Sequence, residues 1–327
     1  MQGTITIEDG SAISTNLEAR FSVVGTTWLI SSNSPEILAA AKETFPDAAD
    51  SSAAIDLTVR LVVNPALVGK TPWPKPYFRG LDHLVYAAYD QNCSMLVDLL
   101  RRRVIGEFSP AMAVDRAYWK RVLLPVLLGI VSAPIGVTPL HCACLVKKGQ
   151  GLIIGGESGA GKSTLSLALG LNGFSYLSDD WTYFSQRDVS TRAWGLPTAI
   201  KLLPDTQTFF PQLEGKTPAP SLNGELAFEV DPEIFSVSRS LSCEPRWLVF
   251  VDRKPGEQTK FEPIGSAEAA DRFLQELEML PPSLAQLRTG QAETVRRLVD
   301  RKCWKLTHSL LPNQLGLELA RFCESSG

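Results

Sequence analysis

The sequence predicts an α/β protein with an α+β lobe at its amino terminus, and three observations support this fold class. Short β-branched runs alternate with turn residues over the first sixty positions. A glycine-rich loop then lies between an apolar strand and a helix at residues 151–171, and from about residue 266 the pattern becomes helical and amphipathic. We therefore expect an amino-terminal lobe over residues 1–110, a core over 111–265, and a helical tail over 266–327 that packs on the core.

The amino-terminal lobe is predicted from three strand-like runs. TITIEDG (4–10), ARFSVVGTTWLISS (19–32) and AAIDLTVRLVV (53–63) are rich in β-branched residues and are broken by Gly, Asp, Asn and Ser. Between the last two runs, Ser34 is suited to cap a short helix that has Pro35 at its first position. We expect mainly antiparallel strands, followed by a proline-rich link.

The overall charge and composition limit the classes of partner. The chain has 327 residues, 44% hydrophobic and 20% charged, which is ordinary for a globular protein. Its formal net charge of −3 provides no basic field for a nucleic acid, so we expect no nucleic-acid partner. The opening MQGTITIEDGS has no secretory pattern, and we expect a cytoplasmic protein. Six scattered cysteines are expected to be reduced and buried.

One segment without charges, residues 122–140, is long enough to cross a membrane. Three prolines lie within it, at 125, 134 and 139. Proline removes a helical hydrogen bond and ends or kinks a helix. We therefore predict no membrane span here, but a buried helix that ends near Val131, a turn, and the approach to a strand.

The glycine-rich loop matches the pattern G-x-x-x-x-G-K-[ST] in full. The match consists of Gly156, Glu157, Ser158, Gly159, Ala160, Gly161, Lys162 and Ser163, and Thr164 follows it. Glycines let backbone N–H groups approach phosphate oxygens at a helix N-terminus, which favours negative charge. Lys162 would reach the β- and γ-phosphates and the Ser163 hydroxyl would hold Mg²⁺. The sequence therefore predicts a nucleotide site with ATP and Mg²⁺ as its cofactors.

Two adjacent carboxylates follow the helix after this loop. Asn172-Gly173 is a good helix end, and Phe174 to Leu177 is predicted to return as a strand beside the loop strand. Asp179 and Asp180 would then lie at the edge of the sheet where the γ-phosphate is expected. Neighbouring residues of a strand point to opposite sides, so one carboxylate is predicted to accept a proton and the other to serve the metal. Asp252, after Val-Phe-Val, is a weaker candidate for the metal.

The segment HCACLVKKGQGLIIGGESGAGKSTLSLALGLNGFSYLSDD, residues 141–180, resembles the catalytic core of the bacterial HPr kinase/phosphorylase family. That family shares a phosphate-loop core with the ATP-type phosphoenolpyruvate carboxykinases, and the resemblance implies such a core here. By position it implies that Lys162 contacts phosphate, that Ser163 holds the metal, and that Asp179 is the base. Asp180 would assist metal binding, and His141 would stand near the transferred phosphoryl group. The resemblance also implies a possible homo-oligomer.

This chain also departs from the family. The later signature segment, with its metal-binding glutamate and glycine-rich helix lead-in, is absent, which argues that HPr is not the substrate. GLPTAIKLL (195–203) stands in its place and resembles related kinases found near peptide-modifying genes. Lys201 is therefore either a phosphate or substrate contact or a solvated strand end. His83 and His308 have no such support and are expected to be structural.

The function that these patterns favour is an ATP- and Mg²⁺-dependent kinase. It would transfer the γ-phosphoryl group to a hydroxyl, most naturally on Ser or Thr of a protein or peptide, although a small-molecule acceptor fits as well. The alternative is a switch or scaffold that binds ATP or GTP without transferring phosphate. The paired aspartates favour the kinase, because a scaffold needs no base beside the γ-phosphate. The amino-terminal lobe is expected to dock a substrate or partner.

Overall fold

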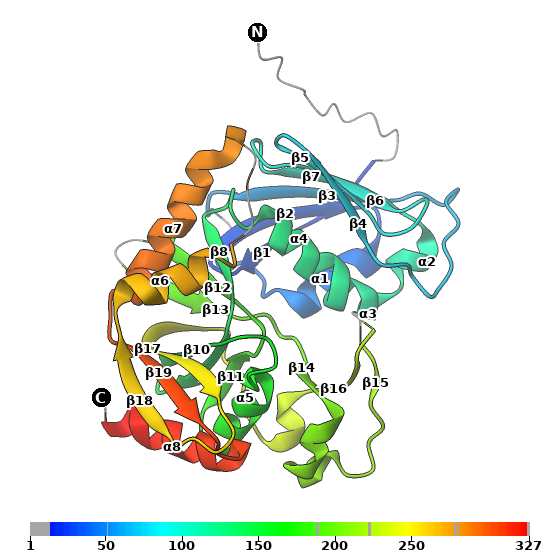
Figure 1. The fold of residues 1–327 in the computed structure, drawn as a ribbon. Helices are drawn as coiled ribbons and strands as arrows, with labels where there is room; N and C mark the ends of the chain where they lie inside the picture. The colour runs from blue at the N-terminus through cyan, green and yellow to red at the C-terminus, as the bar shows by residue number, and fades with distance from the viewer. Residues whose placement is uncertain are drawn as a thin grey trace. The chain divides into compact units, whose positions relative to one another are not determined.

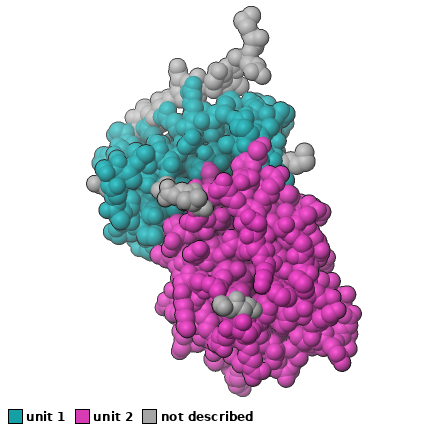
Figure 2. All heavy atoms as spheres, turned by 90° about the vertical axis from the view of Figure 1, so that its left-hand side faces the viewer, with its two compact units in different colours: residues 1–135, 280–288 teal, residues 136–279, 289–327 magenta. Residues whose placement is uncertain are grey.

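The computed structural model describes residues 14–50, 52–187, 190–221, 224–277, 280 and 282–325. The chain forms two compact units, coloured separately in Figure 2. Unit 1 comprises residues 1–135 and 280–288, and unit 2 comprises residues 136–279 and 289–327. The boundary therefore lies after residue 135 and not after 110. The expected tail is not a separate part, because it contributes a strand to the sheet of unit 2.

Unit 1 contains a sheet of seven described strands in the order β1-β2-β3-β7-β6-β5-β4 (Figure 1). Its strands are β1 (Leu17–Val23), β2 (Thr26–Ser32), β3 (Leu57–Val63), β4 (Tyr77–Leu81), β5 (Leu84–Ala88), β6 (Ser94–Asp98) and β7 (Arg103–Phe108). The pairings of β3 with β2 and β7 are parallel, and the other pairings are antiparallel. The expectation of mainly antiparallel strands is confirmed, and the run at 4–10 lies outside the described residues.

The helices of unit 1 include the one predicted after Ser34. They are α1 (Pro35–Thr44), α2 (Pro110–Ala113), α3 (Arg116–Tyr118), the π-helical turn η1 (Trp119–Leu123), α4 (Leu124–Val131) and the 3-10 turn η5 (Pro282–Leu284). Helix α1 has Pro35 in its first turn, as predicted. Helix α4 ends at Val131, where the prolines predict an end. No helix among the described residues has both the length and the apolar character needed to cross a membrane.

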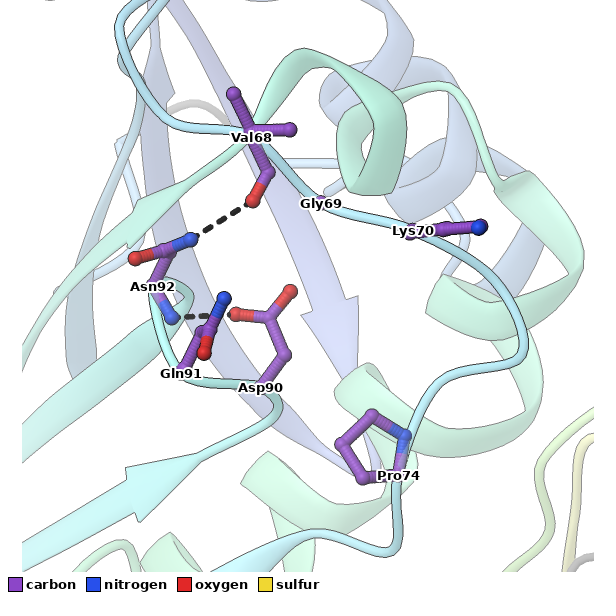
Figure 3. A pocket seen from close by; sticks show the side chains of 7 residues that line it. All are labelled: Val68, Gly69, Lys70, Pro74, Asp90, Gln91 and Asn92. Atoms are coloured by element: carbon purple, nitrogen blue, oxygen red, sulfur yellow. Dashed lines mark hydrogen bonds between the residues drawn. The ribbon is translucent and has the colours of Figure 1, made fainter.

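Unit 1 also contains a pocket of about 440 Å³ (Figure 3). Its lining is formed by Val68, Gly69, Lys70, Pro74, Asp90, Gln91 and Asn92. The polar groups there bind one another: Asn92 donates from its side chain to the Val68 carbonyl and from its backbone to Asp90. The lining contains none of the residues that the sequence predicts to be functional.

Unit 2 contains a larger sheet, for which nine strands are described (Figure 1). Seven follow the order β11-β9-β10-β17-β13-β12-β8, and β19 pairs with both β17 and β18. The strands are β8 (Val137–His141), β9 (Ala143–Lys147), β10 (Gln150–Gly155), β11 (Ser175–Ser178), β12 (Trp181–Arg187), β13 (Ser190–Trp194), β17 (Ser242–Arg253), β18 (Lys260–Ile264) and β19 (Cys303–His308).

A smaller sheet and four helices complete unit 2. The sheet has the order β14-β16-β15, formed by β14 (Ile200–Leu202), β15 (Ala219–Pro220) and β16 (Leu226–Val230). The 3-10 turns η2 (Pro204–Thr208), η3 (Pro211–Leu213) and η4 (Pro232–Phe235) flank it along the chain. The helices are α5 (Lys162–Leu171), α6 (Ser266–Leu274), α7 (Ala285–Val299) and α8 (Pro312–Ser325). Residues 285–288 of α7 belong to unit 1 and residues 289–299 to unit 2.

The core of unit 2 lies on both faces of the larger sheet. Leu152 and Ile154 of β10 pack with residues of α5 and α8, whereas Ile153 packs with residues of α6 and α7. Side chains alternate along a strand, so a strand that is buried on both faces must be apolar throughout. This explains why residues 151–155 of β10 are apolar without interruption. Strand β10 leads into the glycine-rich loop, and α5 follows it.

Gly195 illustrates how closely the chain packs near the end of β11. A Cβ atom at this position would clash with the carbonyl oxygen of Leu177. We expect Gly195→Ala to lower the free energy of unfolding by about 1–3 kcal/mol, the usual cost of overpacking. Equilibrium unfolding in urea measures this change in the free energy of unfolding. The matched control is Gly290→Ala on α7, where a Cβ meets nothing and Ala favours the helix. Equal effects of the two substitutions would contradict the prediction.

Candidate functional site

The predicted phosphate loop lies between β10 and α5, and it has the backbone geometry that its glycines allow. Gly156, Gly159 and Gly161 have φ values of 151°, 83° and 88°. A Cβ at Gly156 would also lie 2.8 Å from the Val251 carbonyl oxygen of β17. Gly161 precedes the first residue of α5, whose free N–H groups are suited to bind an anion. The predicted arrangement of strand, loop and helix is therefore present.

Lys162 is enclosed by its own loop. Its side chain is buried, and Nζ donates hydrogen bonds to the carbonyl oxygens of Gly156 at 2.8 Å and Glu157 at 3.3 Å. Burial lowers the pKa of Lys162, and the nearby charges of Asp180, Glu276 and Asp179 oppose this shift. The ammonium group is thus positioned inside the loop, with carboxylates around it.

Strand β11 carries the two aspartates to the loop, but it is not the neighbour of the loop strand as predicted. It pairs antiparallel with β9, and β9 pairs antiparallel with β10. The prediction was wrong because the β9–β10 hairpin already fills that edge of β10. Two antiparallel steps make β11 run parallel to β10, so the carboxyl ends of both strands still meet at one edge of the sheet.

Asp179 is buried, with 5% of its surface exposed. Its Oδ1 accepts a hydrogen bond of 2.6 Å from the Tyr176 hydroxyl, whereas its Oδ2 is buried without a hydrogen-bond partner in the part of the chain that the structure describes. Burial raises the pKa of Asp179, and the Tyr176 hydroxyl and the nearby Ser163 hydroxyl counteract this by favouring the carboxylate. Asp179 therefore has one unsatisfied oxygen, and the Ser163 hydroxyl lies near its carboxyl group.

Asp180 differs from Asp179 in both exposure and partner. Its side chain is 63% exposed, and Oδ1 lies 3.0 Å from Nε2 of His141. His141 ends β8, opposite Trp181 in the β8–β12 ladder, and the two rings lie 5.7 Å apart. The two aspartates thus have different environments, but both lie in the bend between β11 and β12 and not on a strand, so strand alternation is not the cause.

Lys201 and Asp252 occupy other positions around the loop. The Nζ of Lys201 lies 2.7 Å from Oε2 of Glu225, and it is the backbone N–H of Lys201 that interacts with Asp179. Asp252 is near the end of β17, the parallel neighbour of β10, and its Oδ2 lies 3.2 Å from Nζ of Lys305. Both side chains are therefore engaged in surface ion pairs.

Glu276 is a site residue that sequence reasoning missed. It follows the end of α6, in a stretch that was predicted only as an amphipathic tail. Partial burial raises the pKa of Glu276, and the charges of His141 and Lys162 and the backbone N–H of His141 oppose this shift. Part of the residue remains exposed to solvent. No sequence spacing relates this residue to the loop, so only the fold reveals it.

The oxygens beside the loop fit a magnesium ion, the metal that the loop pattern implies. Mg²⁺ prefers oxygen ligands and often takes only one or two protein carboxylates in addition to phosphates. The Oδ2 of Asp179 and the Ser163 hydroxyl are oxygens of this kind. Within the described ranges, this site included, no group of three or more His, Cys, Asp or Glu side chains is arranged to hold a metal.

Comparisons with known proteins do not establish a family. No protein-family model and no curated protein matches the chain. Among solved structures, the HPr(Ser) kinase/phosphatase from Coxiella burnetii is similar at 15% identity, over 58% of this chain and 95% of that chain, with a TM-score of 0.30. This TM-score is too low to establish a shared fold, so the function of the site must be argued from its own residues.

Proposed function

We propose that this protein is an ATP- and Mg²⁺-dependent kinase that transfers the γ-phosphoryl group to a hydroxyl of a protein or peptide. One observation carries the proposal: the Lys162-Ser163 end of a phosphate loop lies beside a buried carboxylate that has an unsatisfied oxygen. A phosphate loop alone accounts for nucleotide binding. A buried, half-satisfied Asp179 at the same edge of the sheet supports a metal-assisted reaction at the phosphate end of the nucleotide.

The loop and its two side chains would position the nucleotide. The N–H groups of the loop and Lys162 would bind phosphate oxygens, while Ser163 and Asp179 would hold Mg²⁺. When bound, Mg²⁺ supplies positive charge beside the β- and γ-phosphates. Lys162 would have to exchange the carbonyls of Gly156 and Glu157 for phosphate oxygens, which are stronger, charged acceptors.

We assign the proton acceptor to Asp180, the reverse of the roles that the family resemblance implies. A base must be reachable by the acceptor hydroxyl, and Asp180 is exposed whereas Asp179 is buried. His141 fixes one oxygen of Asp180 at 3.0 Å, which leaves the other oxygen to accept a proton. As the acceptor oxygen attacks the γ-phosphorus, its proton moves to Asp180 and the bond to the β-phosphate oxygen breaks, which releases ADP.

The acceptor class and the transfer itself are tested together. Purified protein is incubated with γ-labelled ATP and Mg²⁺, with and without a cell extract separated into protein and small-molecule fractions. We expect label in the protein fraction for the wild type and none for Lys162→Ala. Label in the small-molecule fraction would change the acceptor class and leave the reaction intact. Tight ATP binding without any labelled product would favour the switch or scaffold and reject the kinase.

A further inference from the structure

We infer that Tyr176 is a positioning residue of the site, whose hydroxyl fixes Asp179 so that its second oxygen faces the metal. This inference rests on the proposed function only through the role of Asp179 as a metal ligand. Tyr176 lies on β11, three residues before Asp179, and its hydroxyl donates to Asp179 Oδ1 at 2.6 Å. The side chain is 1% exposed, so the contact is shielded from solvent.

The hydroxyl of Tyr176 is not needed for packing, because the ring of a phenylalanine would fill the same space. The ring belongs to the hydrophobic cluster between the sheet and α5, together with Phe174, Leu165 and Leu169. Burying a phenol hydroxyl in such a cluster is costly unless the hydroxyl is hydrogen-bonded. Its partner is Asp179, the carboxylate beside the phosphate loop. The polar atom of this side chain therefore serves the site and not the core.

Several contacts hold both the backbone and the ring of Tyr176 in place. Its backbone N–H donates to the Ser238 carbonyl at 2.7 Å, and its carbonyl accepts from the Ser240 N–H at 2.7 Å. The guanidinium of Arg239 lies 5.6 Å from the ring centre and donates to the Thr198 carbonyl at 2.9 Å. The Thr198 side chain also acts on the Tyr176 hydroxyl, in the direction that lowers its pKa, although burial raises that pKa overall.

The consequence for Asp179 is an asymmetry between its two oxygens. Oδ1 is held by Tyr176, and Oδ2 is buried without a partner among the described residues. A carboxylate whose rotation is blocked in this way keeps one oxygen available at a fixed position. Hydrogen bonds from outer residues to a ligating group orient that group, and their loss typically weakens metal binding by about 10- to 100-fold.

The test is the Mg²⁺ dependence of nucleotide binding in Tyr176→Phe. We expect the Mg²⁺ concentration for half-maximal binding of ATP to rise by about 10- to 100-fold. The affinity for ATP in EDTA should stay at the wild-type value, because the loop is untouched. In the double variant Tyr176→Phe/Asp179→Asn, the Mg²⁺ dependence should equal that of Asp179→Asn alone, since both changes act on one ligand.

The control is Tyr89→Phe in unit 1, which also removes a buried phenol hydroxyl, but one that has no hydrogen-bond partner in the described structure. It should leave Mg²⁺ dependence unchanged. An unaltered Mg²⁺ dependence in Tyr176→Phe, or an additive effect with Asp179→Asn, would overturn the inference. If Tyr176→Phe does not fold, Thr198→Val must raise the Mg²⁺ requirement instead. The inference is also overturned if the wild type binds ATP equally well with and without Mg²⁺. If ATP binding depends on Mg²⁺ but no phosphate is transferred, only the kinase reaction is rejected.

Discussion

Asp180→Asn should bind ATP with Mg²⁺ as the wild type does and transfer phosphate about 10²- to 10⁴-fold more slowly, the usual contribution of a general base. The reason is that Asp180 is exposed and held by His141, outside the pair formed by Asp179 and Ser163. The amide keeps the shape of the side chain and removes its ability to accept a proton. Single-turnover transfer of label measures the rate, and equilibrium titration with ATP and Mg²⁺ measures binding.

Asp179→Asn is the partner measurement, because it should show the opposite pattern. The buried amide would leave Ser163 as the only remaining member of the proposed metal pair, so we expect nucleotide binding itself to require more Mg²⁺. The roles implied by the family resemblance predict the reverse, with unaltered binding in Asp179→Asn and weakened binding in Asp180→Asn. Two variants and two measurements therefore decide between the assignments. If Asp180→Asn transfers phosphate at the wild-type rate, Asp180 is not the base.

The local elements of the site were predictable because their signals lie in consecutive residues. The apolar run of β10, the glycines before α5 and the helix end at Asn172-Gly173 each depend on nearby atoms only. Their positions follow from backbone sterics and burial, which a sequence pattern records directly. Asp179 and Asp180 do have different environments, but they lie in the bend after β11, so the strand alternation used to predict this does not apply.

The neighbours of these elements were not predictable in the same way. Which strand lies beside β10 depends on a hairpin that occupies one edge and on β17, which is distant in the chain, at the other. Glu276 approaches His141 because α6 packs against the opposite face of the sheet from α5. In the sequence, Tyr176 is one more aromatic residue of a predicted strand. A role for its hydroxyl can be inferred only from the structure, which shows that it binds the buried carboxylate of Asp179.

Lys162→Ala should weaken ATP binding by about 10- to 100-fold, the loss expected when one hydrogen bond from a charged group, worth about 1.5–3 kcal/mol, is removed. Lys162 is buried in its loop, where two carbonyls hold its ammonium group. Burial lowers the pKa of Lys162, which means that the folded protein disfavours its charged form. A bound phosphate would favour the charged ammonium and so offset this effect.

The matched control for this change is Lys216→Ala, since Lys216 is an exposed lysine of the same unit that lies outside the loop. It should bind ATP as the wild type does, and isothermal titration measures both variants. Removing Lys162 also leaves Gly156 and Glu157 without their donor, so unfolding curves of both variants separate a loss of affinity from a loss of structure. If folded Lys162→Ala binds ATP with unchanged affinity, nucleotide binding does not use this loop. The kinase and the switch then fail together, because both depend on a phosphate held between β10 and α5.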